Sequence, residues 1–496
     1  MALPGDRQRR KKVAIVGSGA AGIAALWALN RTHHDVYLYE ASGRLGGHTN
    51  TVEWRAGKYK TLVDMGFTIM NTATYPNFLN FLKRVHVETA PTEMTLGISR
   101  DQGILEWAEN TLDTTFCQPR NLLSPRMWRL VFDTVRFRHF AVDVLMSEDI
   151  KSRSVGSTGI QHRASTEGTI RQYLEREGYS NAFRDDYIIP ITAAIWSTSP
   201  DMCSLEIPAA TLIRLMWSLG LLSTISSRPQ WLTIPAGSRV YIDAVMRGFP
   251  SNHRFLNTAV RAVSNDEDGR VRLSLEGDRS ETYDHVILAT QGDEAYSIIQ
   301  GSATPEEKRI LSRLRPSTNT AILHADVSLM PRSRKAWSSW NCVTQSSSGT
   351  SQRNIGRVSV TYNMNMLQQI PKELFGNVFV TLNPLHEPDP RTVQGRYDYR
   401  QPLYDSDTIR TQQMLARIQN EHLGARVPFR LEEPRCERGK DPKRVFAEMA
   451  LRLLILVVQV FLIGVIAWAV ESYRAKTMRR SLRVNGLSGL VKRKPC

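Results

Sequence analysis

A glycine-rich turn near the N-terminus is the first feature whose residue types and spacing could do chemistry. It follows the apolar run 13–16 and opens the Ala-rich stretch 19–30. One glycine permits a tight turn, a second lets the backbone approach a pyrophosphate, and a third lets helix and strand pack closely. The first N–H groups of such a helix bind phosphate well. The six residues of this predicted dinucleotide site are Gly17, Ser18, Gly19, Ala20, Ala21 and Gly22.

An acidic residue ends the next predicted strand. Glu40 closes the run 36–40 and follows Gly17 by 23 residues. A carboxylate at this place accepts hydrogen bonds from the adenosine ribose hydroxyls and repels a 2′-phosphate. Strand, glycine turn, helix, strand and acid together predict a βαβ unit that binds a dinucleotide. The alternative is a glycine-rich turn with no ligand.

A second glycine turn follows the acid directly, in the stretch 40–48 (EASGRLGGH). Here the sequence resembles the amine-oxidase-like flavoprotein superfamily, whose members carry an R-x-G-G motif after the ribose-binding Glu. More narrowly, it resembles a family of bacterial and fungal NAD/FAD-binding proteins. The stretches that carry the resemblance are 44–52, 63–71, 74–82, 193–200, 208–217, 283–290 and 379–384.

The resemblance implies FAD as the cofactor and gives roles to several residues. Arg44, Gly46 and Gly47 would contact the FAD pyrophosphate, and Gly66 with Phe67 would lie near the flavin ring. The alternative for Arg44 is a solvated cation in a loop.

Two more residues join this predicted site. The resemblance implies that Val260 holds the adenine through its backbone, with ordinary strand packing as the alternative. His48 follows the second glycine turn and is expected near the flavin or the pyrophosphate; the alternative is a structural loop histidine. No catalytic base is identifiable, and no metal site is expected.

The order of these patterns predicts an α/β fold. We expect a Rossmann-type FAD-binding domain, an inserted mixed α+β substrate domain, and a C-terminal transmembrane helix. The predicted parts are a basic arm (1–12), FAD-binding segments (13–90, 236–300 and 376–430), substrate-domain segments (91–235 and 301–375), a basic juxtamembrane stretch (431–452), a membrane helix (453–470) and a basic tail (471–496).

The third FAD-binding segment departs from the family pattern. Such flavoproteins close the site with a late glycine-rich motif that contains an acidic residue and precedes a helix. This chain runs from 416–420 directly into 421–429 without it, so the segment looks truncated. A membrane-anchored variant that has lost FAD and catalysis therefore stays an alternative.

Composition excludes several classes of protein. The 496 residues carry a formal net charge of +16, of which +4 falls in residues 1–12 and +8 in 431–496. The nearly neutral body does not predict a nucleic-acid partner, which would need a basic folded face. Five scattered cysteines without a CxxC argue against a disulfide framework or a zinc site. No motif of a hydrolase or a P-loop NTPase is present.

The segment 453–470 is a candidate membrane contact. It is 18 residues long and uncharged, and it lies between Arg452 and Glu471. That length is at the short end for a bilayer span, and a buried helix of the last domain is the alternative. Basic residues flank both ends, so the positive-inside rule does not choose an orientation. We expect a single-pass or monotopic membrane protein with a cytosolic body; the tail 492–496 resembles an endoplasmic-reticulum retrieval signal.

These patterns lead to a function hypothesis. We expect an FAD-dependent oxidoreductase of the amine-oxidase type that takes hydride from an amine or from an apolar, lipid-like small molecule, with a role in fungal secondary metabolism as one setting. The alternatives are a flavin-dependent lipid desaturase or isomerase, or the variant without FAD.

Deleting residues 449–496 tests the membrane contact. If 453–470 anchors the chain, the shortened protein should leave the membrane fraction in alkaline carbonate, because it loses the uncharged run of 18 residues. The measurement is the partition of both proteins between pellet and supernatant. A shortened protein that stays in the pellet contradicts the anchor.

Overall fold

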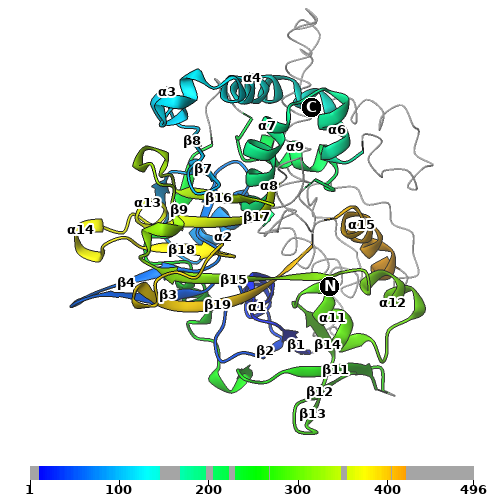
Figure 1. Cartoon of the computed structure of the whole chain (residues 1–496). Helices are drawn as coiled ribbons and strands as arrows, with labels where there is room; N and C mark the ends of the chain where they lie inside the picture. Colours follow the sequence, from blue (N-terminus) through cyan, green and yellow to red (C-terminus); the bar gives the residue numbers. More distant parts are fainter. Residues whose placement is uncertain are drawn as a thin grey trace, which may run out of the picture.

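The computed structural model describes the chain over seven stretches (Figure 1). They are residues 10–145, 168–196, 205–222, 229–266, 268–347, 355–403 and 405–420. The segment 453–470 and its basic flanks lie outside them. Among the described residues, no helix combines the length and the apolar character needed to cross a membrane.

A parallel sheet forms around the first predicted strand. The apolar run 13–16 makes the buried centre of β1 (Lys12–Val16). β2 (Asp35–Tyr39) and β14 (His285–Leu288) pair with β1 on either side, and β10 (Arg254–Phe255) extends the sheet beyond β2. Helix α1 (Ala20–Leu29) connects β1 to β2, as the βαβ pattern predicts. A strand with neighbours on both edges and cover on both faces reads as a continuous apolar run.

β14 lies at the edge of this sheet in the described part of the chain. The apolar run 284–290 predicts a buried strand, and that prediction is wrong: Val286, Ile287 and Leu288 are only half-buried. The reason is that no described strand covers the outer edge of β14. Within the described residues the sheet therefore ends at β14, and the edge of a sheet is a place where a further strand can pair.

A seven-stranded sheet forms the middle layer of the molecule in Figure 1. Its order is β19-β15-β18-β17-β16-β7-β8, and all neighbours are antiparallel except β16 and β7. β18 and β19 fall within the predicted segment 376–430, yet they pair with this sheet. The strands are β7 (Leu96–Arg100), β8 (Leu105–Ala108), β15 (Pro316–His324), β16 (Trp340–Ser346), β17 (Ile355–Asn363), β18 (Phe379–Leu382) and β19 (Val393–Pro402).

A group of helices packs on the seven-stranded sheet and encloses the largest hydrophobic core. The longest, α4 (Pro125–Phe140), begins with a capped turn: the Ser124 side chain accepts a hydrogen bond from the Met127 N–H, and Pro125 stands at the first position. The others are α3 (Leu112–Thr115), α6 (Ile170–Arg176), α7 (Asn181–Phe183), the π-helix Arg184–Ile188, α8 (Ile189–Trp196) and α9 (Ala209–Ser218).

Smaller elements join the two main sheets. Three minor sheets are β3 (Thr51–Ala56) with β4 (Tyr59–Asp64); β5 (Ile69–Asn71), β9 (Trp231–Thr233) and β6 (Ala90–Thr92); and β11 (Val260–Asn265), β12 (Val271–Leu275) and β13 (Ser280–Tyr283). The remaining helices are α2 (Pro76–Arg84), α10 (Arg239–Met246), α11 (Gly292–Ile299), α12 (Pro305–Leu311), α13 (Met364–Leu367), α14 (Lys372–Phe375) and α15 (Ser406–Asn420).

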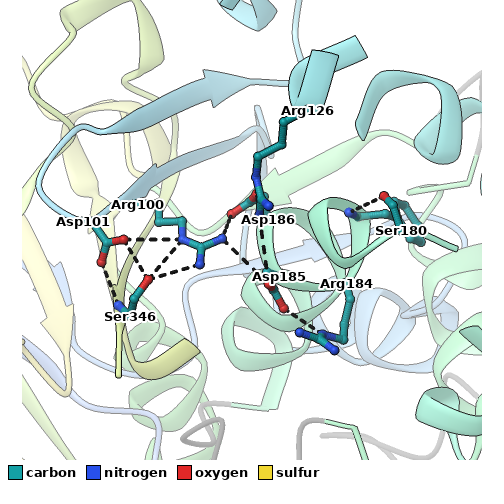
Figure 2. Close-up of polar contacts among 9 residues, drawn as sticks. Arg100, Asp101, Arg126, Ser180, Arg184, Asp185, Asp186 and Ser346 are labelled. Carbon is teal, nitrogen blue, oxygen red and sulfur yellow. Dashed lines mark hydrogen bonds and ion pairs between the residues drawn. The ribbon is translucent and has the colours of Figure 1, made fainter. Parts of the chain in front are cut away.

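A buried charge network ties α4 to the large sheet (Figure 2). Asp186, in the π-helix, accepts from Arg100 Nη1 at 2.9 Å and from Arg126 Nη2 at 2.5 Å. Arg100 ends β7 and Arg126 begins α4, so this carboxylate joins sheet and helix. Asp185 lies next to it, 3.8 Å from Arg100. Both aspartates and Arg100 are buried.

The Asp186→Asn substitution should weaken the helical layer. It leaves the buried Arg100 guanidinium without its nearest carboxylate, which costs about 3 kcal/mol of unfolding free energy. The measurement is urea denaturation of the variant against the parent chain.

The matched control is Glu206→Gln, which removes the solvent-exposed pair with Arg171. We expect little change there, because water screens that pair. Equal, small shifts in both variants would show that the buried network does not stabilise the fold.

Candidate functional site

The first glycine turn connects β1 to α1 and depends on close backbone contacts. Gly17 has a φ of +98°, and a Cβ there would lie 2.7 Å from the Ala289 carbonyl oxygen. A Cβ on Gly22 would lie 1.8 Å from the Gly17 oxygen. Only glycine fits at these two positions, so the turn is held tightly between α1 and the end of β14.

Gly19 behaves differently from its two neighbours. It precedes α1 with an ordinary φ of −61°, and a Cβ added there would meet no atom of the described residues within 4 Å. No side chain caps the helix at this residue. Ala20 and Ala21 form the first turn of α1. Its N–H groups therefore face an open approach, which fits the predicted phosphate.

Glu40 links the two glycine turns. One carboxylate oxygen accepts from the Ser18 N–H at 2.9 Å and from Ser18 Oγ at 2.5 Å, and the other accepts from the Ser42 N–H at 2.9 Å. Ser18 Oγ in turn accepts from the Gly46 N–H at 3.2 Å. Sequence reasoning missed this bracing role: the fully buried Ser18 side chain is directed toward Glu40.

The second glycine turn lies directly against the first. Gly46 and Gly47 have φ values of +113° and +56°, and a Cβ on Gly47 would lie 3.2 Å from the Gly19 Cα. Arg44 folds back on its own turn, where Nη2 donates to the Gly47 carbonyl oxygen at 2.8 Å. The structure thus brings the residues predicted for the pyrophosphate together at the start of α1.

His48 follows this turn and is half-buried within the site, with its Nε2 atom out of contact with solvent. Its ring stacks on Tyr399 with a centroid distance of 5.3 Å. Burial lowers the pKa of the imidazole, and a hydrogen bond with the Arg400 backbone opposes this in part. Its Nε2 atom has no hydrogen-bond partner among the described residues. Gly66 is adjacent, since a Cβ there would lie 2.2 Å from the His48 carbonyl oxygen.

Strand β19 crosses from the large sheet to this turn; it lies within the segment 376–430 predicted to bind FAD, although none of its residues was singled out. The Asn50 side-chain amide donates to the Tyr399 hydroxyl at 2.8 Å, and Gln291 Nε2 donates to the Arg400 carbonyl oxygen at 2.5 Å. Arg400 also forms an ion pair with Asp293, at the start of α11. Asn50 lies within the stretch 44–52 that carries the resemblance, but no sequence signal indicated Tyr399 or Arg400.

A buried carboxyl holds the loop that leads to Gly66. Asp64 accepts from Thr51 Oγ1 at 2.5 Å and from the Ser238 N–H at 2.9 Å, which joins β4 to the start of α10. Burial raises the pKa of Asp64 to about 6, while these hydrogen bonds oppose the shift. These hydrogen bonds join Asp64 to Thr51 and Ser238, so Asp64 holds the loop before Gly66 in position.

Val260, the residue that the resemblance places at the adenine, follows a segment that is hydrogen-bonded to the backbone of Glu40 and Ser42. The Thr258 N–H donates to the Glu40 carbonyl oxygen at 2.9 Å, and the Asn257 N–H donates to the Ser42 carbonyl oxygen at 3.0 Å. Val260 follows these contacts, begins β11 and packs in a core with Val16 and Tyr39. The structure therefore places Val260 on the segment that runs beside Glu40; its contact with the adenine stays a prediction.

The groups left open around the two glycine turns fit a bound dinucleotide. An uncapped helix start, the open face of Gly19 and the unpartnered Nε2 of His48 lie on adjoining turns. Buried polar atoms of this kind are rare unless something else pairs with them.

A family model of flavin-containing amine oxidoreductases matches residues 20–328. The chain belongs to this family. Membership confirms the predicted superfamily, the FAD cofactor and the expectation of an FAD-dependent oxidoreductase. No curated protein matches the chain.

Solved structures of the family share the fold at low sequence identity. An engineered putrescine oxidase gives a TM-score of 0.51 at 15% identity, over 76% of each chain. Cyclohexylamine oxidase from Brevibacterium oxydans gives 0.51 at 14%, over 81% of this chain and 90% of its own. A fatty acid isomerase from P. acnes gives 0.53 at 13%, over 91% and 99%. These likenesses confirm the mixed α/β fold.

Two alanine substitutions separate cofactor binding from folding. Gly19→Ala adds a methyl group that meets no atom of the described residues within 4 Å, so the thermal midpoint of the apoprotein should fall only slightly, because alanine is a poorer N-cap than glycine. The methyl group should clash with the pyrophosphate and weaken the binding free energy of FAD by about 1–3 kcal/mol. This loss raises the Kd for FAD roughly 5- to 150-fold. Gly22→Ala should instead destabilise the fold, because its methyl meets the Gly17 oxygen.

The measurements are an FAD titration and a thermal melt of each variant. Gly301→Ala is the matched control, since its methyl also meets nothing within 4 Å, away from the two glycine turns. Unchanged FAD affinity in Gly19→Ala would contradict the placement of the cofactor at this turn.

Proposed function

We propose that this chain oxidises a small organic molecule by hydride transfer to an FAD held at the start of α1. The observation that carries the proposal is the meeting of the open Gly19 face, the Glu40 carboxylate and the second glycine turn. Bound FAD supplies the redox chemistry by accepting the hydride.

We further propose how the chain divides this work. The strands β1, β2, β10 and β14 fall within 13–90 and 236–300, which supports an FAD-binding domain of Rossmann type made from these segments. Most strands of the large sheet fall within 91–235 and 301–375, which supports a substrate domain inserted between them.

The cofactor contacts proposed for each residue follow its place in the site. The start of α1 and the turn 44–47 would hold the pyrophosphate. Glu40, which accepts hydrogen bonds from two serines, would also accept hydrogen bonds from the ribose hydroxyls. Gly66 would leave room for the flavin ring. The backbone of Val260 would meet the adenine.

His48 would contribute an uncharged polar atom to the cofactor site. Its lowered pKa favours the neutral imidazole, and its Nε2 is left without a protein partner. The stacking on Tyr399 and the bond to the Arg400 backbone fix the ring, so Nε2 would be held in place before the cofactor binds. We propose His48 as a positioning residue for the flavin.

The substrate is proposed to be an amine or an apolar small molecule. Two structural relatives are named for oxidation of amines, putrescine oxidase and cyclohexylamine oxidase, and a third is named as an isomerase of a fatty acid. The apolar segment 453–470 supports the apolar class, because a chain at a membrane would meet lipid-soluble substrates. We propose a cytosolic body held at the membrane by this segment.

A second candidate is a chain of this family that no longer binds FAD. One observation in its favour is β14, which is half-buried and has no described strand paired on its outer edge beside the site. The other is the missing late glycine-rich motif. The two candidates differ in whether the chain takes up FAD at all.

Anaerobic mixing with candidate substrates tests the reaction class. The full chain is loaded with FAD and mixed with putrescine, with cyclohexylamine and with an unsaturated fatty acid, while the flavin absorbance is followed. We expect bleaching by the substrate that is oxidised and hydrogen peroxide when air is admitted. A changed fatty acid without net peroxide would favour an isomerase instead. A folded chain that takes up no FAD would contradict the oxidoreductase.

A further inference from the structure

Three amide side chains form a hydrogen-bonded row across the large sheet. Asn383 directly follows β18, Asn319 lies in β15 and Gln401 lies in β19. Asn383 Nδ2 donates to Asn319 Oδ1 at 2.7 Å, and Asn319 Nδ2 donates to Gln401 Oε1 at 3.2 Å. We call these three residues the amide row. Asn319 is buried and Gln401 is half-buried, so the row ends at a residue that a bound molecule can reach.

A backbone group fixes the direction of the amide row. The Thr320 N–H, which can only donate, gives its hydrogen bond to Asn383 Oδ1 at 3.0 Å. The Asn383 amide therefore presents its NH2 group to Asn319, and the NH2 group of Asn319 in turn faces the Gln401 oxygen. Flipping any one of these amides would set two donors or two acceptors against each other. The free end of the row is Gln401 Nε2, a donor without an acceptor among the described residues.

The strand register places this free end on the face of the sheet that meets His48. Asn319 pairs with Tyr399, and directly paired residues have their side chains on the same face. Gln401 follows Tyr399 by two residues, so it shares that face. Tyr399 stacks on His48, and the backbone of Arg400, which lies between Tyr399 and Gln401, is hydrogen-bonded to the same histidine. Gln401 is therefore next to the proposed flavin site.

A fixed donor at this place discriminates between the proposed classes of substrate. A primary ammonium group carries donors alone, so it has nothing to offer Nε2. A carboxylate carries acceptors alone and gains a charge-assisted hydrogen bond there. The nearby charges do not reverse this preference. Arg400 forms an ion pair with Asp293; burial raises the pKa of Tyr399, and Arg44 opposes that shift more strongly than Asp64 adds to it.

We infer that Gln401 Nε2 donates a hydrogen bond to a carboxylate of the substrate, so that the site takes an organic acid in preference to an amine. The inference rests on the proposed function, because it narrows the substrate of that reaction. An oxygen of FAD offers the same chemistry to the donor. The amide row belongs to the seven-stranded sheet, however, whereas the glycine turns and Glu40 adjoin the parallel sheet, which favours the substrate as the acceptor.

The substitution Gln401→Glu tests the donor while it keeps the amide row. One carboxylate oxygen of the new side chain can still accept from Asn319 Nδ2, and the free end changes from a donor to an acceptor. The probes are decanoate and decylamine, which share one chain length and differ in the end group. Calorimetry measures the binding of each probe to the full chain, without and with FAD. Gln345→Glu is the matched control, because it adds the same charge at an exposed position of β16.

We expect Gln401→Glu to weaken the binding of decanoate by at least about tenfold, because a hydrogen bond to a charged group is lost. The binding of decylamine should stay the same or become tighter, the Kd for FAD should not change, and Gln345→Glu should leave all three unchanged. Equal weakening of both probes would show a structural role of Gln401 and overturn the inference. A weaker affinity for FAD alone, or a parent chain that binds no decanoate under either condition, would overturn it as well.

The proposed oxidation can fail separately from this inference. A parent chain that takes up no FAD contradicts the oxidoreductase, and the titration without FAD still decides whether Gln401 binds the carboxylate. A chain that takes up FAD and is reduced by an amine, but does not bind decanoate, keeps the oxidoreductase and contradicts the role of Gln401.

Discussion

The Cα of Gly22 lies against the carbonyl group of Gly17, so close that a methyl group there would approach the oxygen to 1.8 Å. This contact fixes the direction in which α1 leaves β1. The helix start then faces the second glycine turn, with Gly47 against Gly19, and Glu40 holds both turns through Ser18 and Ser42. Because Glu40 and Ser18 hold the two turns together, the protein itself fixes the geometry proposed for binding the pyrophosphate. Such preorganisation spares the cost of ordering loops on binding.

Strand β19 couples this nucleotide site to the rest of the protein. It belongs to the seven-stranded sheet, yet its Tyr399 stacks on His48 and its Arg400 reaches the start of α11. The buried carboxylates Asp64 and Asp186 act in the same manner elsewhere: each joins a strand or helix end to a distant segment through several hydrogen bonds. The positions of the functional loops depend on these few polar contacts.

The sequence predicted what short-range patterns specify. The turn 17–22, the acid at 40 and the second turn at 44–48 have fixed spacings with separate physical reasons, and the structure brings them together. It did not predict contacts between remote segments: Asn50 and Tyr399 are 349 residues apart, and nothing local marks them as partners. The exposed edge of β14 was missed because an apolar run reveals a preference for burial but not whether a neighbouring strand is present. Likewise, the buried Asp186 that pairs with Arg126 at the start of α4 lies 60 residues further along the chain, and no local pattern links the two.

The account depends on FAD binding at the two glycine turns, despite the missing late motif and the open edge of β14. The most direct measurement is the visible spectrum of the purified full chain, with the flavin then released by heat, identified and quantified. We expect a flavin spectrum and about one FAD per chain. A folded, colourless protein that added FAD cannot reconstitute would contradict it, and would show that the glycine turns alone do not retain the cofactor.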